Sequence, residues 1–281
     1  MKKRDRIYTA LLIIVLVVGL SLLLYPSFSD WWNSRVQTKL ISNYNEIVAK
    51  LDTEDYSELW DSAKAYNEEL WNRDNPYLLS EDHQERYKQL LNPAGDGIMG
   101  YVEIPDIDIL LPIYHGTDEL VLQVAIGHLD WTSLPTGGPD THSVISGHRG
   151  LPSARLFTDL DKIVVGDLFM LHILDETLTY EVDQIRIVEP DETDELMLQE
   201  GKDLCTLVTC TPYGVNSHRL LVRGHRVENQ AEAVVVRVTA DAVVVEKLVV
   251  APFVLMPILL VMMIWLFASS RKRKNNRPSS E

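Results

Sequence analysis

The spacing of apolar residues predicts two membrane spans, one near each end of the chain. Residues 8–25 and 248–268 are apolar almost without interruption, and about 20 such residues cross the hydrocarbon core of a bilayer as a helix. The first stretch could also be read as a cleaved signal peptide. Because Tyr25-Pro26-Ser27-Phe28 lacks the small residues of a cleavage site, the pattern favours an uncleaved anchor.

A helical period follows the first span, within the segment 26–97. Apolar residues recur every three or four positions over 36–51 and again over 56–70, with a break at Asp52-Thr53. This spacing predicts two amphipathic helices that pack on a main domain. Residues 73–93 are polar and contain Asn-Pro twice, which predicts a loop between these helices and the main domain.

Short β-rich runs separated by turn residues fill residues 98–228 and predict a mainly β domain with flanking helices. Helical pieces interrupt it at 118–124 and 153–160, and regularly spaced short strands are typical of a sandwich or barrel. Residues 229–247 form a Val-rich connector that fits either a strand or a helix. The predicted strands are 101–104, 107–114, 142–146, 168–173, 178–188, 205–210 and 220–222.

Basic residues lie outside both predicted spans. Residues 1–7 carry +3 and residues 269–281 carry +4, so both ends are expected in the cytoplasm and the segment between them outside the cell. From a net charge of −15, these two ends leave −22 on that segment. Such acidity argues against nucleic acid and anionic lipid as partners. It fits attraction of a cationic nucleophile such as a lysine amine, or more simply a role in solubility.

The two cysteines do not suit a disulfide with each other. Cys205 and Cys210 lie on one predicted strand, where five residues at about 3.3 Å each separate them by about 16 Å, beyond disulfide reach. Their odd offset also points them to opposite faces. Cys210 is therefore expected to be a free thiol at a strand end, and Cys205 a small buried residue.

Cys210, His148 and Arg219 form a candidate catalytic set. A thiol at a strand end is held rigidly yet open to a cleft, and a cation or imidazole nearby raises its reactivity. His148 suits an acid/base role, and Arg219 offers a fork of donors to an oxyanion or carbonyl. On spacing alone the trio is no more than suggestive, and His218 is a rival base. No histidine pair shows metal-ligand spacing with acidic partners, so neither a metal nor a cofactor is expected.

Short strings spread in order over residues 98–227 make the candidate set specific. They are LPIYHGT from Leu111, TSLP from Thr132, SGHRGLP from Ser146, LFTDL from Leu156, TLVTCTPYG from Thr206 and HRLLVRG from His218. Together they resemble the sortases and, within that family, the class C group that polymerises pilins.

The resemblance implies a sortase-like closed β-barrel in which Cys210 is the nucleophile, His148 the acid/base and Arg219 the stabiliser of the substrate carbonyl or its oxyanion. It implies cleavage of a Leu-Pro-x-Thr-Gly-like sorting signal at Thr-Gly and transfer of the acyl group to an amine, typically a pilin lysine. Thr209 and Thr211 are carried over as lining of the substrate groove. Class C members often carry a second, C-terminal span, which agrees with the two-pass membrane topology predicted above.

The chain departs from the class C pattern at two places. Members of the class that this chain resembles have a lid before the barrel, and the lid contains an Asp-Pro-aromatic string. The corresponding residues 74–77 of this chain read Asp-Asn-Pro-Tyr. The hypothesis is that Asp74 approaches Arg219 and Tyr77 covers Cys210; the alternative is a solvated loop whose proline stops a helix. Trp131 stands where the family usually has glycine.

Three functions remain in competition at this point. The first is a membrane-anchored cysteine transpeptidase that joins pilin subunits. The nearest alternative is an enzyme of the same family that anchors single surface proteins to the cell wall. A non-catalytic scaffold for pilus assembly, which would only bind sorting signals, is the alternative of a different class. A thiol redox protein is disfavoured because the chain has no Cys-x-x-Cys pair.

Overall fold

The structure of the chain is a computed structural model that describes residues 3–73, 77 and 79–229, with the backbone alone at 3–10 and 12. Two compact units make it up: Met1–Phe28 with Val234–Glu281, and Ser29–Ala233. Within the first unit the described residues are helical. The predicted second span (248–268) and basic tail (269–281), and the connector beyond residue 229, lie outside the described residues.

A single helix, α1 (Lys3–Val48), contains both the first predicted span and the first predicted amphipathic helix. The part of it from Ile13 to Val48 includes an 18-residue window of mean hydropathy 1.9, none of which is buried. This helix is therefore long and apolar enough to cross a membrane. From Ser29 onward it belongs to the second unit, where it packs on the barrel.

Two further helices precede the barrel. The predicted break after α1 is confirmed, because Asp52 caps α2 (Thr53–Trp71) by accepting hydrogen bonds from the main-chain N–H groups of Glu54 and Asp55. The predicted loop over 73–93 is wrong where it covers α3 (Glu81–Gln89). Only Tyr87 of this helix is buried, so it lacks apolar periodicity, and its signal is instead a Ser80 cap with acidic residues in the first turn.

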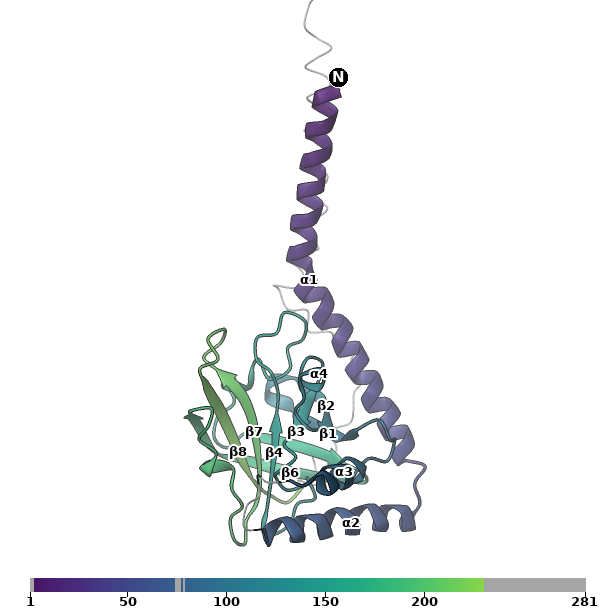
Figure 1. Cartoon of the computed structure of the whole chain (residues 1–281), viewed down its shortest axis with the longest axis vertical. Coiled ribbons are helices and arrows are strands. Elements are labelled where there is room, and N and C mark those ends of the chain that lie inside the picture. Colours follow the sequence, from purple (N-terminus) through teal and green to yellow (C-terminus); the bar gives the residue numbers. More distant parts are fainter. Residues whose placement is uncertain (1–2, 74–76, 78, 230–281) are drawn as a thin grey trace, which may run out of the picture. The chain divides into compact units, whose positions relative to one another are not determined.

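Eight strands close into a barrel in the order β1-β2-β3-β4-β7-β8-β6-β5 (Figure 1). The pairs β2/β3 and β4/β7 are parallel, and the others are antiparallel. The predicted closed barrel is therefore confirmed. The strands are β1 (Ile98–Ile104), β2 (Ile109–His115), β3 (Ile126–His128), β4 (Thr141–Ser146), β5 (Leu168–Ile173), β6 (Glu176–Val188), β7 (Asp203–Thr211) and β8 (His218–Arg226).

Short segments account for the differences from the predicted elements. Strand β3 has three residues, too few for an alternating pattern, and was not predicted. Helix α4 (Glu119–Leu122) lies within the predicted 118–124 piece. The 3-10 turns are η1 (Pro105–Ile107), η2 (Leu160–Lys162) and η3 (Asp194–Leu196). Of the helix predicted over 153–160, only residue 160 is helical, in η2.

The barrel interior is apolar and is joined to the helices by buried hydrogen bonds. Ile113, Phe169 and Leu207 are fully buried in the main core. The Tyr44 hydroxyl of α1 donates to the Met99 carbonyl at 3.0 Å and accepts from the Leu174 N–H at 2.8 Å. A buried hydroxyl without a hydrogen-bond partner would lower the stability of the fold. The two bonds satisfy the Tyr44 hydroxyl and hold α1 against the end of the sheet.

Candidate active site

Cys210 and Arg219 lie on the neighbouring strands β7 and β8, and His148 lies in the turn that follows β4, on the other side of β7. Cys210 on β7 is the register partner of Arg219 on β8. On its other side β7 pairs with β4, where Ser146 faces Val208 and the Gly147 N–H donates to the Val208 carbonyl at 3.0 Å. Continuing this parallel register by two residues places His148 opposite Cys210. Cys210 and Arg219 thus share a face of the sheet, because paired residues do, and the turn that follows β4 brings His148 to the same end of β7.

The two cysteines of β7 occupy opposite environments, as the strand geometry predicted. Both are free thiols; Cys205 is fully buried inside the barrel, whereas Cys210 is partly exposed. Burial raises the pKa of the Cys205 thiol well above its ordinary value. Only Cys210 is therefore placed to react with a molecule that approaches from outside.

Two glycines in the Ser-Gly-His-Arg-Gly string are required by close packing around His148. A Cβ atom at Gly147 would lie 2.7 Å from the Ile126 side chain and 2.8 Å from the Phe157 ring. Gly150 has φ +77 and would meet the Tyr213 ring at 2.9 Å. The turn that follows β4 can therefore lie against both the core and the β7–β8 turn only without side chains at these positions.

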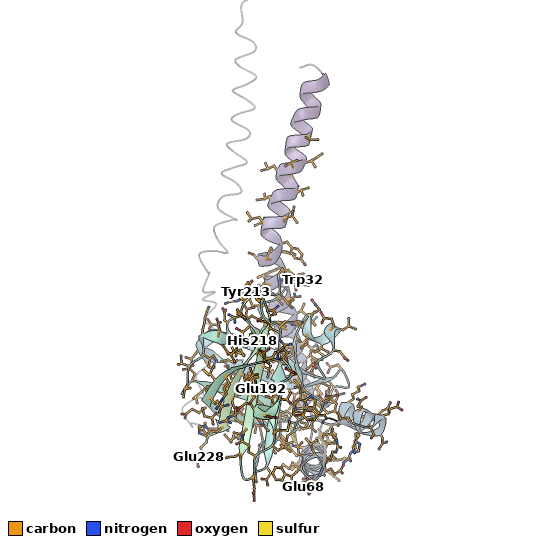
Figure 2. The ribbon with its side chains drawn as sticks, turned by 60° about the vertical axis from the view of Figure 1, so that its left-hand side comes forward. Trp32, Glu68, Glu192, Tyr213, His218 and Glu228 are labelled. Atoms are coloured by element: carbon orange, nitrogen blue, oxygen red, sulfur yellow. The ribbon has the colours of Figure 1, made fainter. Side chains whose placement is uncertain are left out.

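Each of the two candidate histidines lies near its own carboxylate. His148 Nε2 lies 3.8 Å from Glu119 Oε2 on α4, and its side chain is 28% exposed. His218 Nε2 lies 3.3 Å from Glu189 Oε1, and its Nδ1 lies 2.8 Å from the Ser217 hydroxyl. Sequence reasoning missed Glu119, because 29 positions separate it from His148 and no short motif joins them. Figure 2 shows His218 below Tyr213 near the β7–β8 turn.

Arg219 is held by main-chain carbonyls. Its Nη1 donates to the carbonyls of Asn216 at 3.4 Å and His218 at 3.2 Å. By contrast, Arg223, four residues along the same strand, donates two hydrogen bonds to Asp183, at 2.9 and 3.1 Å. The two arginines share a strand face, yet only Arg223 is committed to a carboxylate within the described part of the chain.

Thr209 and Thr211 flank Cys210 and are both buried. The Thr209 hydroxyl donates to the Gly147 carbonyl at 2.8 Å, and the Thr211 hydroxyl accepts from Arg149 Nη1 at 3.3 Å. Both residues thus tie β7 to the turn that carries His148. Their expected place in the lining of a substrate groove stays a prediction.

An apolar cluster covers the outer face of the sheet on the side of Cys210. Val208, two residues before Cys210 on β7 and hence on the same face, is 7% exposed and packs with Val144 and Leu221. This outer cluster also contains Val188, Leu196, Leu129 and Trp131. Trp131, the departure from the family pattern, therefore packs on the face that carries the thiol.

Tyr77 lies against this outer cluster. Its ring centroid is 4.7 Å from that of Trp131, and its hydroxyl lies 2.7 Å from the Thr193 hydroxyl. The hydroxyl also lies 3.6 Å from the Met197 sulfur. Asp74, the other residue of the predicted lid, falls outside the described residues.

The buried side chain of His142 links the segment between β6 and β7 to strand β7 beneath the outer cluster. His142 is fully buried, with Nδ1 2.9 Å from the Met197 carbonyl and Nε2 2.7 Å from the Thr206 hydroxyl. Burial lowers the pKa of His142 to about 4, so the ring is neutral at physiological pH. In the described part of the chain, no group of three His, Cys, Asp or Glu side chains is arranged to hold a metal ion.

Comparisons with known proteins decide the family. Residues 102–227 match the sortase domain. Over 147 residues the chain is 31% identical to sortase D of Bacillus subtilis, a match that spans 51% of this chain and 71% of the relative. The chain belongs to the sortase family. It is thus a cysteine transpeptidase, anchored to the membrane by its N-terminal helix.

Solved structures of class C sortases are similar to this sortase. Sortase C1 of Streptococcus agalactiae is 52% identical with a TM-score of 0.67, over 68% of this chain and all of that one. Sortase C of Clostridium perfringens, solved with the C-terminal cell wall sorting motif, is 42% identical with a TM-score of 0.60, again over 68% of this chain and all of that one. The resemblance to class C found in the sequence is therefore confirmed.

Proposed function

We propose that this sortase builds covalent pili by a two-step acyl transfer at Cys210. The thiolate attacks the threonine carbonyl of a Leu-Pro-x-Thr-Gly-like sorting signal, and the Thr–Gly bond breaks as His148 gives a proton to the departing glycine amine. A lysine amine of a second pilin then attacks the thioester. His148 takes its proton, an amide forms between the pilins, and the Cys210 thiolate is released.

The observation that carries this proposal is the pairing of Cys210 on β7 with Arg219 on β8, with His148 in the turn that follows β4 on the other side of β7. Neighbouring strands are about 4.8 Å apart, so β8 holds Arg219 beside Cys210 on one side, and the turn after β4 carries His148 on the other side of β7. A cation beside the attacked carbonyl stabilises the oxyanion that forms there. Cys210 and Arg219 lie on rigid strands, and the Thr209 hydroxyl ties the turn that carries His148 to β7, which suits this need for fixed geometry.

The acceptor amine distinguishes pilin polymerisation from wall anchoring. Identity favours the first, because the similar class C structures share 39–52% of residues whereas the sortase A relatives share 25–31%. The proposed second span at 248–268 would place both termini in the cytoplasm and the catalytic unit outside. The acidic surface of that unit fits a cationic acceptor.

Tyr77 is proposed to restrict access to Cys210. The support is its contact with Trp131, which belongs to the outer cluster on the thiol-bearing face of β7. In this proposal the lid lies along the face on which the sorting signal must bind, and Asp74 is its partner for Arg219. Substrate binding then requires that Tyr77 leave the outer cluster.

The test uses the purified full chain, a peptide that carries the sorting signal, and a pilin domain with its lysines intact or replaced by arginine. We expect a covalent acyl-enzyme at Cys210 by intact mass, followed by an amide to a pilin lysine. His148→Ala should lose this activity, whereas the matched variant His218→Ala should keep much of it. Transfer only to a cell-wall peptide amine would favour wall anchoring, and no acyl-enzyme at all would favour the scaffold.

A further inference from the structure

Exposed apolar side chains gather at the end of the barrel where β4 and β7 finish. Leu120 lies in α4 and Val124 shortly after it, and they are 86% and 48% exposed. Tyr213 and Val215, in the turn between β7 and β8, are 61% and 69% exposed. Single exposed apolar residues are ordinary, but several together at one end mark an interaction surface. We name Leu120, Val124, Tyr213 and Val215 the apical residues.

The apical residues lie at the end of the second unit that is hydrogen-bonded to the part of α1 with which this unit begins. Gln37 of α1 donates to the Val124 carbonyl at 2.8 Å. Nearby, Asn33 donates to the Ser153 carbonyl at 2.7 Å, and Asp30 accepts from the Arg155 N–H at 2.8 Å. Figure 2 shows Trp32 and Tyr213 at this same end, and Glu68 and Glu228 at the opposite end.

The chain itself limits how far this end can lie from a bilayer. The apolar span ends at Tyr25, and five residues later Asp30 already contacts the 153–155 loop. Whatever the angle between the two units, five residues reach at most roughly 18 Å. The headgroup region adds about 5–8 Å outside the hydrocarbon core. The end of the barrel that carries the apical residues is thus linked to the apolar span by a short segment of chain.

We infer that the apical residues dock into the headgroup region of the bilayer that holds α1. The partner is lipid, and the attraction is apolar burial rather than charge. Two cations at this end are paired with carboxylates, since Arg149 bonds Asp161 and Arg155 bonds Asp159. Trp31 and Trp32, which are 50% and 57% exposed, belong to the residue type that prefers this depth. A tether makes such docking intramolecular, so weak individual contacts suffice.

Docking would place His148, Cys210 and Arg219 near the lipid surface. Leu120 follows Glu119, whose carboxylate lies near His148, and Tyr213 packs against Gly150 two residues after His148. A substrate whose sorting signal adjoins its own membrane segment would then reach Cys210 without leaving the surface. This consequence rests on the proposed function, but docking itself does not.

Lipid docking is tested without any substrate, in the full chain reconstituted in phosphatidylcholine vesicles. In a Cys210→Ala background, single cysteines at positions 120, 215, 68 and 228 carry an environment-sensitive fluorophore, and Cys205 stays unlabelled because it is buried. Nitroxide lipids labelled near the headgroup should quench the probes at 120 and 215 at least about threefold more than those at 68 and 228. The difference should persist in 0.5 M salt, because salt screens attraction between charges and leaves apolar contacts unaffected.

Equal quenching at all four positions would overturn the inference. Quenching at 120 and 215 that appears only when a membrane-embedded substrate is added would also overturn it, because the partner would then be the substrate. As a second measurement, the double variant Leu120→Asp/Val215→Asp should lose quenching of a probe at position 213. The same double variant with Cys210 retained and no probe attached should be acylated by a soluble sorting peptide within twofold of the parent; an equal loss of docking and peptide acylation would mean local damage and count against the inference.

Discussion

Strand β7 carries one thiol inside the barrel and one at its rim, only five residues apart. Cys205 is fully buried and its pKa is raised by burial, whereas Cys210 is partly exposed and lies between the strand that bears Arg219 and the strand that leads to His148. The same residue type is thus inert at one end of the strand and placed for chemistry at the other. Reactivity here depends on strand parity and on the neighbouring strands, not on the cysteine itself.

The largest effect should separate the two thiols directly. Cys210→Ala should lower transpeptidation by roughly 10⁴-fold or more, as expected when the nucleophile is removed, with stability changed by less than about 0.5 kcal/mol. Cys205→Ala should do the opposite: activity stays within a few-fold, and stability falls by about 1 kcal/mol through the cavity left in the core. Peptide turnover and urea unfolding measure the two quantities. If Cys205→Ala abolished the acyl-enzyme while remaining folded, the assignment of the nucleophile would be wrong.

The next effect compares two arginines on β8. Arg219→Ala should lower kcat by about 10²–10³-fold, the usual cost of losing one oxyanion donor, and Arg219→Lys should recover part of this. Arg223→Ala is the matched control, because its guanidinium is held by Asp183 on the same face. It should keep activity within a few-fold. Comparable losses in kcat for both variants would show that Arg219 acts through the fold and not on the reacting carbonyl.

The sequence was enough to predict the closed barrel, and the set of Cys210, His148 and Arg219 was proposed from the same ordered motifs. Strand alternation and the odd offset of Cys205 and Cys210 required no long-range information. The glycines around His148 belong to the Ser-Gly-His-Arg-Gly string, and close packing explains why these positions are glycine. The string indicated the site before the structure showed this physical reason. Tertiary contacts such as Glu119 with His148 follow from barrel closure, which no local pattern encodes.

Local sequence patterns missed helix α3 and could not predict the contacts of Tyr77. The apolar pattern misses α3, because Tyr87 is its only buried residue and its hydroxyl is bound to the buried His128 at 2.9 Å. Tyr77 meets Thr193 and Met197, 116 and 120 positions away. Its contact with Trp131 gives the unusual residue at position 131 a structural role that the family pattern could not suggest.

An intermediate effect concerns the neutral histidines inside the molecule. Burial lowers the pKa of His142 to about 4 and that of His128 to about 3. Because the folded pKa lies below the ordinary value of 6.5, the unfolded chain binds more protons as the pH falls, and stability is lost from about pH 6.5 downward. One pH unit below that value the loss is about 1.4 kcal/mol for each histidine. Urea unfolding at pH 7.5 and 5.5 should show it.

A matched variant isolates the contribution of one ring. His142→Gln should be less stable than the parent at pH 7.5, since the bond to the Met197 carbonyl is weakened. Its further loss between pH 7.5 and 5.5 should be smaller by about 1.4 kcal/mol. A parent protein whose stability did not fall over this range would contradict the neutral, buried state of both histidines.

The smallest effect returns to access at Cys210. An aromatic pair contributes about 0.5–1.5 kcal/mol, so Tyr77→Ala and Trp131→Gly should each raise the rate of Cys210 alkylation by about 2–10-fold. The double variant should be no faster than the faster single one, because both changes break the same contact. Cys205 serves as the internal reference, since it should stay unmodified in every variant that remains folded. If neither change altered the rate, the Tyr77 contact would not govern access to the thiol, and the exposure of Cys210 would be set by the barrel rim alone.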